Sequence, residues 1–202
     1  MEAAIVKTAD LDVHHGLAVI RRKGTEGGFS LLEVLIAGAI LTIGLVALLG
    51  LFTTALSSTQ SSQMDQIAKE RATQMLESIY TARQTNQLTF GAINNVGTGA
   101  GVFLPNMIQL SDPGPDGLDA TADDITPPAP YVLPGPDGLL GTGDDVTLSL
   151  SNFKRQVQIT NALNPDGTAN PNLKQIVVTV QYPGPTGNLR QYSVQALVSS
   201  FR

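Results

Sequence analysis

The chain has 202 residues, a formal net charge of −5 and no cysteine. This length fits one domain with an appendage, and the acidic balance predicts no nucleic-acid partner. The lack of cysteine excludes disulfides, thiolate metal sites and cysteine nucleophiles. Both histidines, His14 and His15, precede Gly28, so a chain cut there would have neither imidazole nor thiol. Because most general bases and nucleophiles need one of these groups, we predict that the protein is not an enzyme.

The first 28 residues are polar and of mixed charge, and they end in a basic cluster at 21–23 and a small pair, Gly27-Gly28. The basic cluster lies just before a long apolar run, which favours a cytoplasmic location for this end of the chain. A secretory signal peptide has its small-residue cleavage site after a shorter apolar region. Two interpretations stay open on these grounds: a removable leader over 1–28, or a signal anchor that is never cut.

An uncharged apolar run of 23 residues extends from Val34 to Leu56. At about 1.5 Å rise per residue, a helix of this length crosses a hydrocarbon core of about 30 Å. We predict one helix over 29–85, of which 29–56 spans the membrane. Glu33 lies at the mouth of the run, where a carboxylate costs about 3 kcal/mol on insertion, so it suggests a function. The alternative is a carboxylate stabilised by the dipole at the helix N-terminus.

The second half of this helix is amphipathic. Apolar residues recur there at the i, i+3, i+4 spacing of one helix face, which predicts packing on a globular part. A coiled coil is the alternative, but the pattern lasts little more than two heptads. The stripe consists of Met64, Ile67, Ala68, Ala72, Met75, Leu76, Ile79 and Tyr80.

We predict a globular head over 86–202 whose C-terminal part, 146–202, forms an antiparallel sheet of three or four strands. Residues 146–150, 155–160, 175–182 and 192–198 alternate or are rich in β-branched side chains. The cluster of proline and glycine at 183–188 predicts a hairpin between the last two segments, and 161–172 reads as the loop before it. One apolar face of this sheet is expected to meet the helix stripe.

An acidic repeat occupies 112–147. Residues 114–126 recur at 135–147 with nine of 13 positions identical, and the segment from Asp112 to Asp145 holds eight aspartates and no Lys or Arg. Calcium takes oxygen ligands from such loops, so a calcium site is one hypothesis. The other is a solvated, flexible acidic loop. The candidate ligands are Asp116, Asp119, Asp123 and Asp124 in the first copy and Asp137, Asp144 and Asp145 in the second.

The run Gly28-Phe29-Ser30-Leu31-Leu32-Glu33, followed by the uncharged helix, resembles the type IV pilin and pseudopilin family. Within it, 29–37 with 43–45 is most similar to minor pilins of the PilV type. The resemblance implies a pilin-like α+β fold, with 29–56 also forming the filament core. It implies that prepilin peptidase removes 1–28 by cutting between Gly28 and Phe29, and that the new Phe29 amine is N-methylated.

The same resemblance implies that Glu33 of one subunit lies near the Phe29 amine of a neighbour in a helical filament. The partners would be the prepilin peptidase and methyltransferase, the inner membrane and other pilin subunits. The protein would be a single-pass inner-membrane protein with a periplasmic head, and later part of an extracellular or periplasmic filament. The chain lacks the cysteine pair that staples many pilins, so another interaction is expected to brace 112–147.

Two other functions stay open at this point. One is a pseudopilin of a type II secretion system, which the sequence does not separate from a pilus subunit. The other is a membrane-anchored calcium-binding or adhesive module whose anchor resembles that of a pilin. No cofactor is expected apart from the hypothetical calcium.

Overall fold

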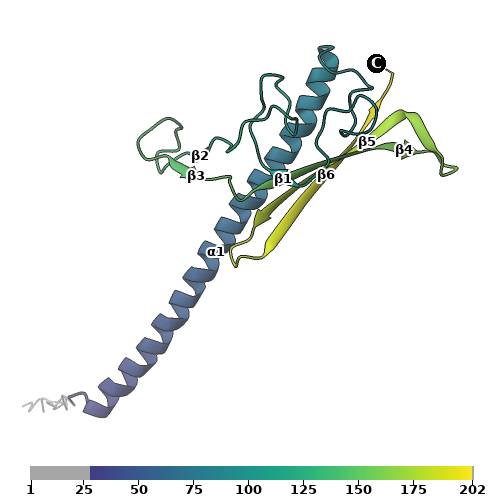
Figure 1. Ribbon diagram of the computed structural model, residues 1–202. Coiled ribbons are helices and arrows are strands. Elements are labelled where there is room, and N and C mark those ends of the chain that lie inside the picture. Colours follow the sequence, from purple (N-terminus) through teal and green to yellow (C-terminus); the bar gives the residue numbers. More distant parts are fainter. Residues whose placement is uncertain (1–27, 202) are drawn as a thin grey trace, which may run out of the picture. The chain divides into compact units, whose positions relative to one another are not determined.

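The computed structural model describes residues 28–201, so the predicted leader, apart from Gly28, lies outside the described residues. It contains one long helix, α1 (Leu31–Gln84), followed by six strands (Figure 1). The chain divides into two compact units between Leu48 and Leu49. The long predicted helix is therefore present, with ends within two residues of those expected from the sequence.

The start of α1 is set by Ser30. Its carbonyl accepts the Glu33 N–H at 3.0 Å, and its hydroxyl accepts the same N–H at 3.2 Å. Ser30 therefore caps a helix whose third residue is Glu33, a Ser-x-x-Glu arrangement that is typical of helix N-termini. From 31 to 56 every side chain is exposed. By length and composition α1 is able to cross a membrane.

In the second unit, α1 buries the predicted apolar stripe. The stripe packs with inward side chains of the sheet, such as Val157, Ile176 and Val178, in one hydrophobic cluster. Met64 and Tyr80, at the ends of the predicted stripe, are partly buried against this cluster. The prediction that one helix face covers the sheet is confirmed. The buried helix residues of the cluster are Ile67, Ala68, Ala72, Met75, Leu76, Ile79 and Ala82.

The main sheet has four antiparallel strands in the order β1-β4-β5-β6. Its strands are β1 (Ile108–Gln109), β4 (Lys154–Leu163), β5 (Ala169–Pro183) and β6 (Leu189–Ser199). The predicted hairpin is confirmed, because β5 and β6 pair from Leu173↔Ser199 to Pro183↔Leu189. β1 pairs with only two residues of β4. Further along the same edge of β4, the side-chain amide of Asn95 donates to the Val157 carbonyl and accepts the Ile159 N–H, each at 2.8 Å.

The predicted loop over 161–172 is wrong at both ends. β4 continues past a register shift at Asn161/Leu163, and β5 begins at Ala169. The turn is only 164–168, because the Asn164 N–H donates to the Thr168 carbonyl at 2.8 Å and closes it. The side chains of these two residues also bond each other at 3.0 Å. These contacts allow the strands to extend into a segment whose composition suggested a loop.

The segment at 146–148 does not join the main sheet, so the prediction of one sheet over 146–202 is wrong there. It forms β3 (Val146–Leu148), which pairs with β2 (Tyr131–Leu133) in a separate two-stranded sheet. The reason lies between these strands, where the second acidic repeat folds back on itself and brings its two ends together. The fourth strand of the main sheet is instead β1, from an earlier part of the chain.

Candidate functional site

The two acidic repeats adopt the same fold. In the first, the backbones of Asp112 and Ile125 exchange two hydrogen bonds, of 3.0 and 2.9 Å. The residues 21 positions later, Leu133 and Val146, pair in the same way at the end of the β2–β3 ladder. Apart from its last residue, each repeat therefore lies in a closed loop, 112–125 or 133–146, whose first and last residues are neighbours.

Hydrogen bonds to aspartate carboxylates hold the first loop in shape. The Asp123 carboxylate accepts the Thr121 hydroxyl at 2.7 Å and the Asp116 N–H at 3.2 Å. The Asp124 carboxylate accepts the N–H groups of Ala120, at 2.8 Å, and Thr121, at 3.2 Å. Donation by the Thr121 hydroxyl, and then by the Asp116 N–H, lowers the pKa of Asp123. The carboxylates of these two aspartates therefore accept hydrogen bonds from backbone N–H groups and a hydroxyl group of the same tight loop.

The second loop repeats these contacts at equivalent positions. The Asp144 carboxylate accepts the Thr142 hydroxyl at 2.7 Å and the Asp137 N–H at 3.3 Å. The Asp145 carboxylate accepts the Gly141 N–H at 2.7 Å. Donation by Thr142 is the main cause that lowers the pKa of Asp144. The repeat in the sequence is thus a repeat of one local structure rather than of composition alone.

A glycine starts each loop because the chain passes close to an aspartate. A Cβ added to Gly114 would clash with the carbonyl of Asp123. We expect Gly114→Ala to destabilise the second unit by about 1–3 kcal/mol, because the backbone must shift to relieve the overlap. Urea unfolding of the full-length protein measures this loss. Gly143→Ala is the matched control, since its Cβ would meet no atom within 4 Å; an equal loss in both variants would contradict the explanation.

The two loops differ in what they contact. The first is docked on the main sheet through Arg155, whose side chain is 1% exposed. Its Nη2 lies 3.2 Å from Oδ1 of Asp119 and 3.7 Å from Oδ2 of Asp124. It also donates to the Ser111 hydroxyl at 3.3 Å. Burial raises the pKa of Asp119, while Arg155 acts in the opposite direction. For the first loop, though not for the rest of 112–147, this cluster supplies the brace that was expected in place of a disulfide.

The second loop has no such dock among the residues that the structure describes. Leu140 stands where the first copy has Asp119, and no arginine or lysine within 28–201 pairs with Asp145. Leu139 and Leu140 are 62% and 66% exposed, whereas the equivalent Leu118 is 4% exposed. One copy of the motif is therefore built into the core, and the other presents its acids and leucines to solvent.

These contacts divide the seven predicted calcium ligands. Asp119 and Asp124 are committed to the buried Arg155, whose positive charge opposes a cation there, so the first loop does not fit a calcium site. Asp116 and Asp123 pair with no cation of residues 28–201 themselves but lie in the same loop as these two acids. Within residues 28–201, Asp137, Asp144 and Asp145 of the second loop also have no cationic partner. Within the same residues no group of three or more His, Asp or Glu side chains is arranged to hold a metal ion. The calcium hypothesis is thus narrowed to the second loop and stays a prediction.

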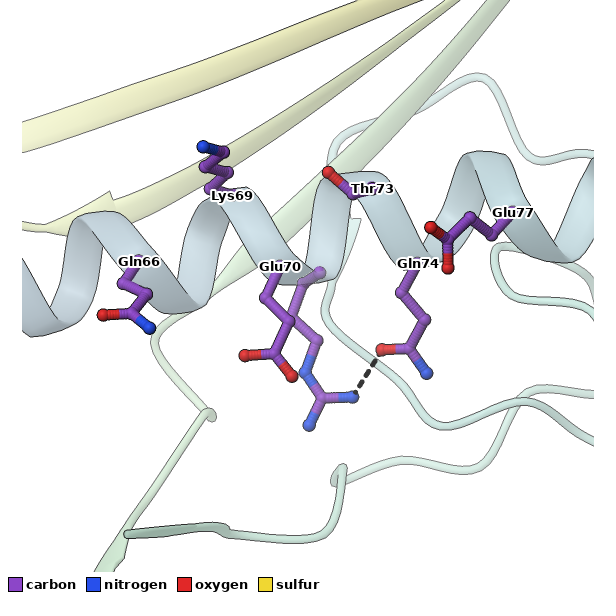
Figure 2. Close-up of a pocket in the computed structure, with 7 residues that line it drawn as sticks. Gln66, Lys69, Glu70, Thr73, Gln74 and Glu77 are labelled. Carbon is purple, nitrogen blue, oxygen red and sulfur yellow. Dashed lines mark hydrogen bonds between the residues drawn. The ribbon is translucent and has the colours of Figure 1, made fainter.

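A polar groove of about 710 Å³ follows the solvent side of α1. Figure 2 shows Gln66, Glu70 and Gln74 on one side of the helix. Arg71 Nη1 donates to the Gln74 amide oxygen at 3.1 Å. Glu70 accepts the Tyr131 hydroxyl at 2.7 Å, which fastens β2 to the helix and raises the pKa of Tyr131. The groove is lined by neither histidine nor cysteine, and two of its four ionic residues, Glu70 and Arg71, serve structural contacts. We assign no chemistry to it.

The residues of the predicted processing and assembly site lie around the start of α1. Gly28 and Phe29 precede the helix, and Phe29 is 81% exposed. Glu33 is in the first helical turn and is also exposed. A peptide bond that a protease must reach and an acid that a neighbour must meet both require such exposure. Sequence reasoning did not identify Arg155, although its inward position in the alternation of β4, with Val157 and Ile159, indicates a buried charge that needs partners.

Comparison with known proteins finds no matching family model, no matching curated protein and no matching solved structure. The function is therefore inferred from the residues and their geometry.

Proposed function

We propose that this chain is a minor pilin, a structural and assembly subunit of a type IV pilus. In this proposal prepilin peptidase cuts between Gly28 and Phe29, and the mature chain enters a helical filament. The observation that carries it is the start of α1: a small pair, an aromatic residue, and a single carboxylate followed by an uncharged helix exposed from 31 to 56. Such a surface must be buried by lipid or by other helices.

The chemistry of Glu33 favours assembly over simple anchoring. A carboxylate within hydrocarbon is costly unless it meets a cation. Cleavage before Phe29 would create an amine close in sequence to the acid, and that amine stays positive when methylated. An acid and an amine at similar depth on adjacent helices would pair, and the pairing would set the axial register between subunits. Before assembly the protein would lie in the inner membrane with residues beyond the helix in the periplasm.

The amino terminus of the mature protein tests this proposal. Mass spectrometry of the protein purified from membranes or filaments is expected to find N-methylated Phe29 as the first residue. An intact Met1, or a cut after Leu56, would refute pilin processing and favour a membrane-anchored adhesive module. A methylated Phe29 is equally expected of a secretion pseudopilin, so the neighbouring genes, for pilus assembly or for a secretin system, separate these two.

We further propose that the second acidic loop binds calcium. Its three carboxylates lie within nine residues and, within 28–201, have no basic side chain to neutralise them. Hard oxygen donors of this kind suit Ca²⁺. The ligands would be Asp137, Asp144 and Asp145, whose carboxylates are not arranged around a metal position in the structure and would have to turn toward the ion. The first loop would stay metal-free because Arg155 supplies its positive charge.

Chymotrypsin cleavage at the exposed Leu139 and Leu140 measures calcium binding. At a Ca²⁺ concentration of ten times Kd we expect cleavage to slow about tenfold, because the ion stabilises the closed loop by about 1.4 kcal/mol. Mg²⁺ at the same concentration serves as the ion control. Asp144→Asn is expected to remove the protection, and the equivalent Asp123→Asn in the first loop to leave it intact. Equal cleavage with and without Ca²⁺ would refute the calcium site.

A further inference from the structure

A second cavity of about 400 Å³ lies where the last turn of α1 meets the end of β6. Apolar groups form most of its wall, including the side chains of Leu197, Val198 and Phe201. Tyr80 also lines it, but its hydroxyl already donates to the Leu197 carbonyl at 3.0 Å. The cavity lies within the second unit and is separate from the acidic loops and from the start of α1.

Arg83 lines this cavity with an unused donor. The residue is 9% exposed. Its Nη2 donates to the Phe201 carbonyl at 3.3 Å, but its buried Nη1 has no hydrogen-bond partner among residues 28–201. An unpaired donor on a buried charge costs more than an unpaired neutral group. The neighbouring Ser199 hydroxyl accepts the Phe201 N–H at 3.1 Å and, within the described residues, gives its proton to no acceptor.

The charge around Arg83 is also uncompensated. Arg83 and Lys174 approach the ring of Phe90, at 5.3 and 4.4 Å from its centroid. The Lys174 ammonium is satisfied by the carbonyls of Phe90 and Ile93, at 2.7 and 2.8 Å, yet no carboxylate of residues 28–201 forms an ion pair with either cation. Burial, and then the charge of Arg83, lower the pKa of Lys174. Two buried positive charges therefore share one region in which residues 28–201 supply no anion.

We propose that this cavity binds a small organic acid, whose carboxylate bonds Arg83 Nη1 and the Ser199 hydroxyl while its apolar body lies against Leu197 and Phe201. A carboxylate offers two acceptor oxygens for the two free donors, and its charge compensates that of Arg83. The largely apolar wall selects an acid that carries a hydrocarbon group over a bare inorganic anion. This proposal stands apart from pilus assembly and from calcium binding.

The test uses the full-length protein in a neutral detergent, with hexanoate as the probe and hexanamide as its uncharged analogue. Nitrogen-15 NMR of the arginine side chains and of the 197–201 amides follows each titration. Millimolar hexanoate is expected to shift the Arg83 Nε–H and these amides to saturation. Hexanamide is expected to bind at least about tenfold more weakly, since it lacks the charge-assisted bond.

Arg83→Gln is expected to weaken hexanoate binding at least about tenfold. Arg190→Gln, which removes an exposed arginine paired with Asp65, is expected to leave binding unchanged. The Arg155 signal reports in each variant whether the second unit stays folded. The comparison of hexanoate with hexanamide needs no variant, so it decides the matter even if Arg83→Gln unfolds. No saturable shift with hexanoate, or equal binding of hexanamide, would overturn the proposal.

Discussion

Replacing Arg155 by methionine is expected to lower the free energy of unfolding of the second unit by about 3–5 kcal/mol. Methionine fills a similar volume, so the loss comes chiefly from charge. Asp119 and Asp124, both 6% exposed at their side chains, would be left buried without a cation. Urea unfolding followed by tyrosine fluorescence measures the effect, because all four tyrosines lie in this unit. They are Tyr80, Tyr131, Tyr182 and Tyr192.

Arg190→Met is the matched control. It breaks an ion pair of similar length, 3.0 Å to Asp65, but one whose partners are 39% and 41% exposed. Such a pair is worth about 0–1 kcal/mol. Adding Asp119→Leu to Arg155→Met is expected to recover part of the loss, because the second loop already carries leucine at this position. If Arg155→Met lowers the free energy of unfolding no more than Arg190→Met does, the claim that Arg155 holds the first loop on the main sheet is refuted.

Glu33→Gln is expected to reduce incorporation into filaments at least about tenfold, since a charge-assisted hydrogen bond is worth about 1.5–3 kcal/mol. The variant should still be cut after Gly28 and should still enter the membrane. Glutamine keeps the size of the side chain and its ability to cap the helix, so the substitution removes the negative charge alone. Quantitative detection of the subunit in sheared filaments and in membranes measures the ratio.

Ser30→Ala separates the charge from the cap. It removes the hydroxyl that accepts the Glu33 N–H and weakens the start of α1 by about 1 kcal/mol, but it leaves the carboxylate in place. Incorporation is expected to stay within about threefold of the unchanged protein. If Glu33→Gln assembles normally while Ser30→Ala does not, Glu33 acts through the helix terminus and the pairing with a neighbouring amine is refuted.

Local patterns in the sequence predict the parts of this fold that depend on a single element. Periodicity identified α1 and its buried stripe from Ile67 to Ile79 because one helix face repeats every three or four residues. Turn chemistry identified the β5–β6 hairpin. The assignment of 146–148 to the main sheet failed because β-propensity shows that a segment is extended but does not name its partner.

The acidic segment shows a different limit. In the sequence, the aspartates of the two copies differ little in their spacing. In the structure, the two copies differ because Arg155, which lies 36 residues from Asp119, contacts only the first. No local rule connects these residues. Two signals could have done so: an arginine at an inward position of β4, and the single copy of the repeat that carries an acid where the other carries Leu140.

The closed geometry of the two loops has a consequence for how this region can change over generations. Because the first and last residues of each loop are neighbours, the residues between them can be gained or lost while the flanking chain keeps its path. The docked copy is constrained by Arg155, but the undocked copy is free to diversify. We expect variants of this chain to differ in length and sequence within the second loop, with the copy nearest to Ser111 always retaining both of its arginine-binding aspartates.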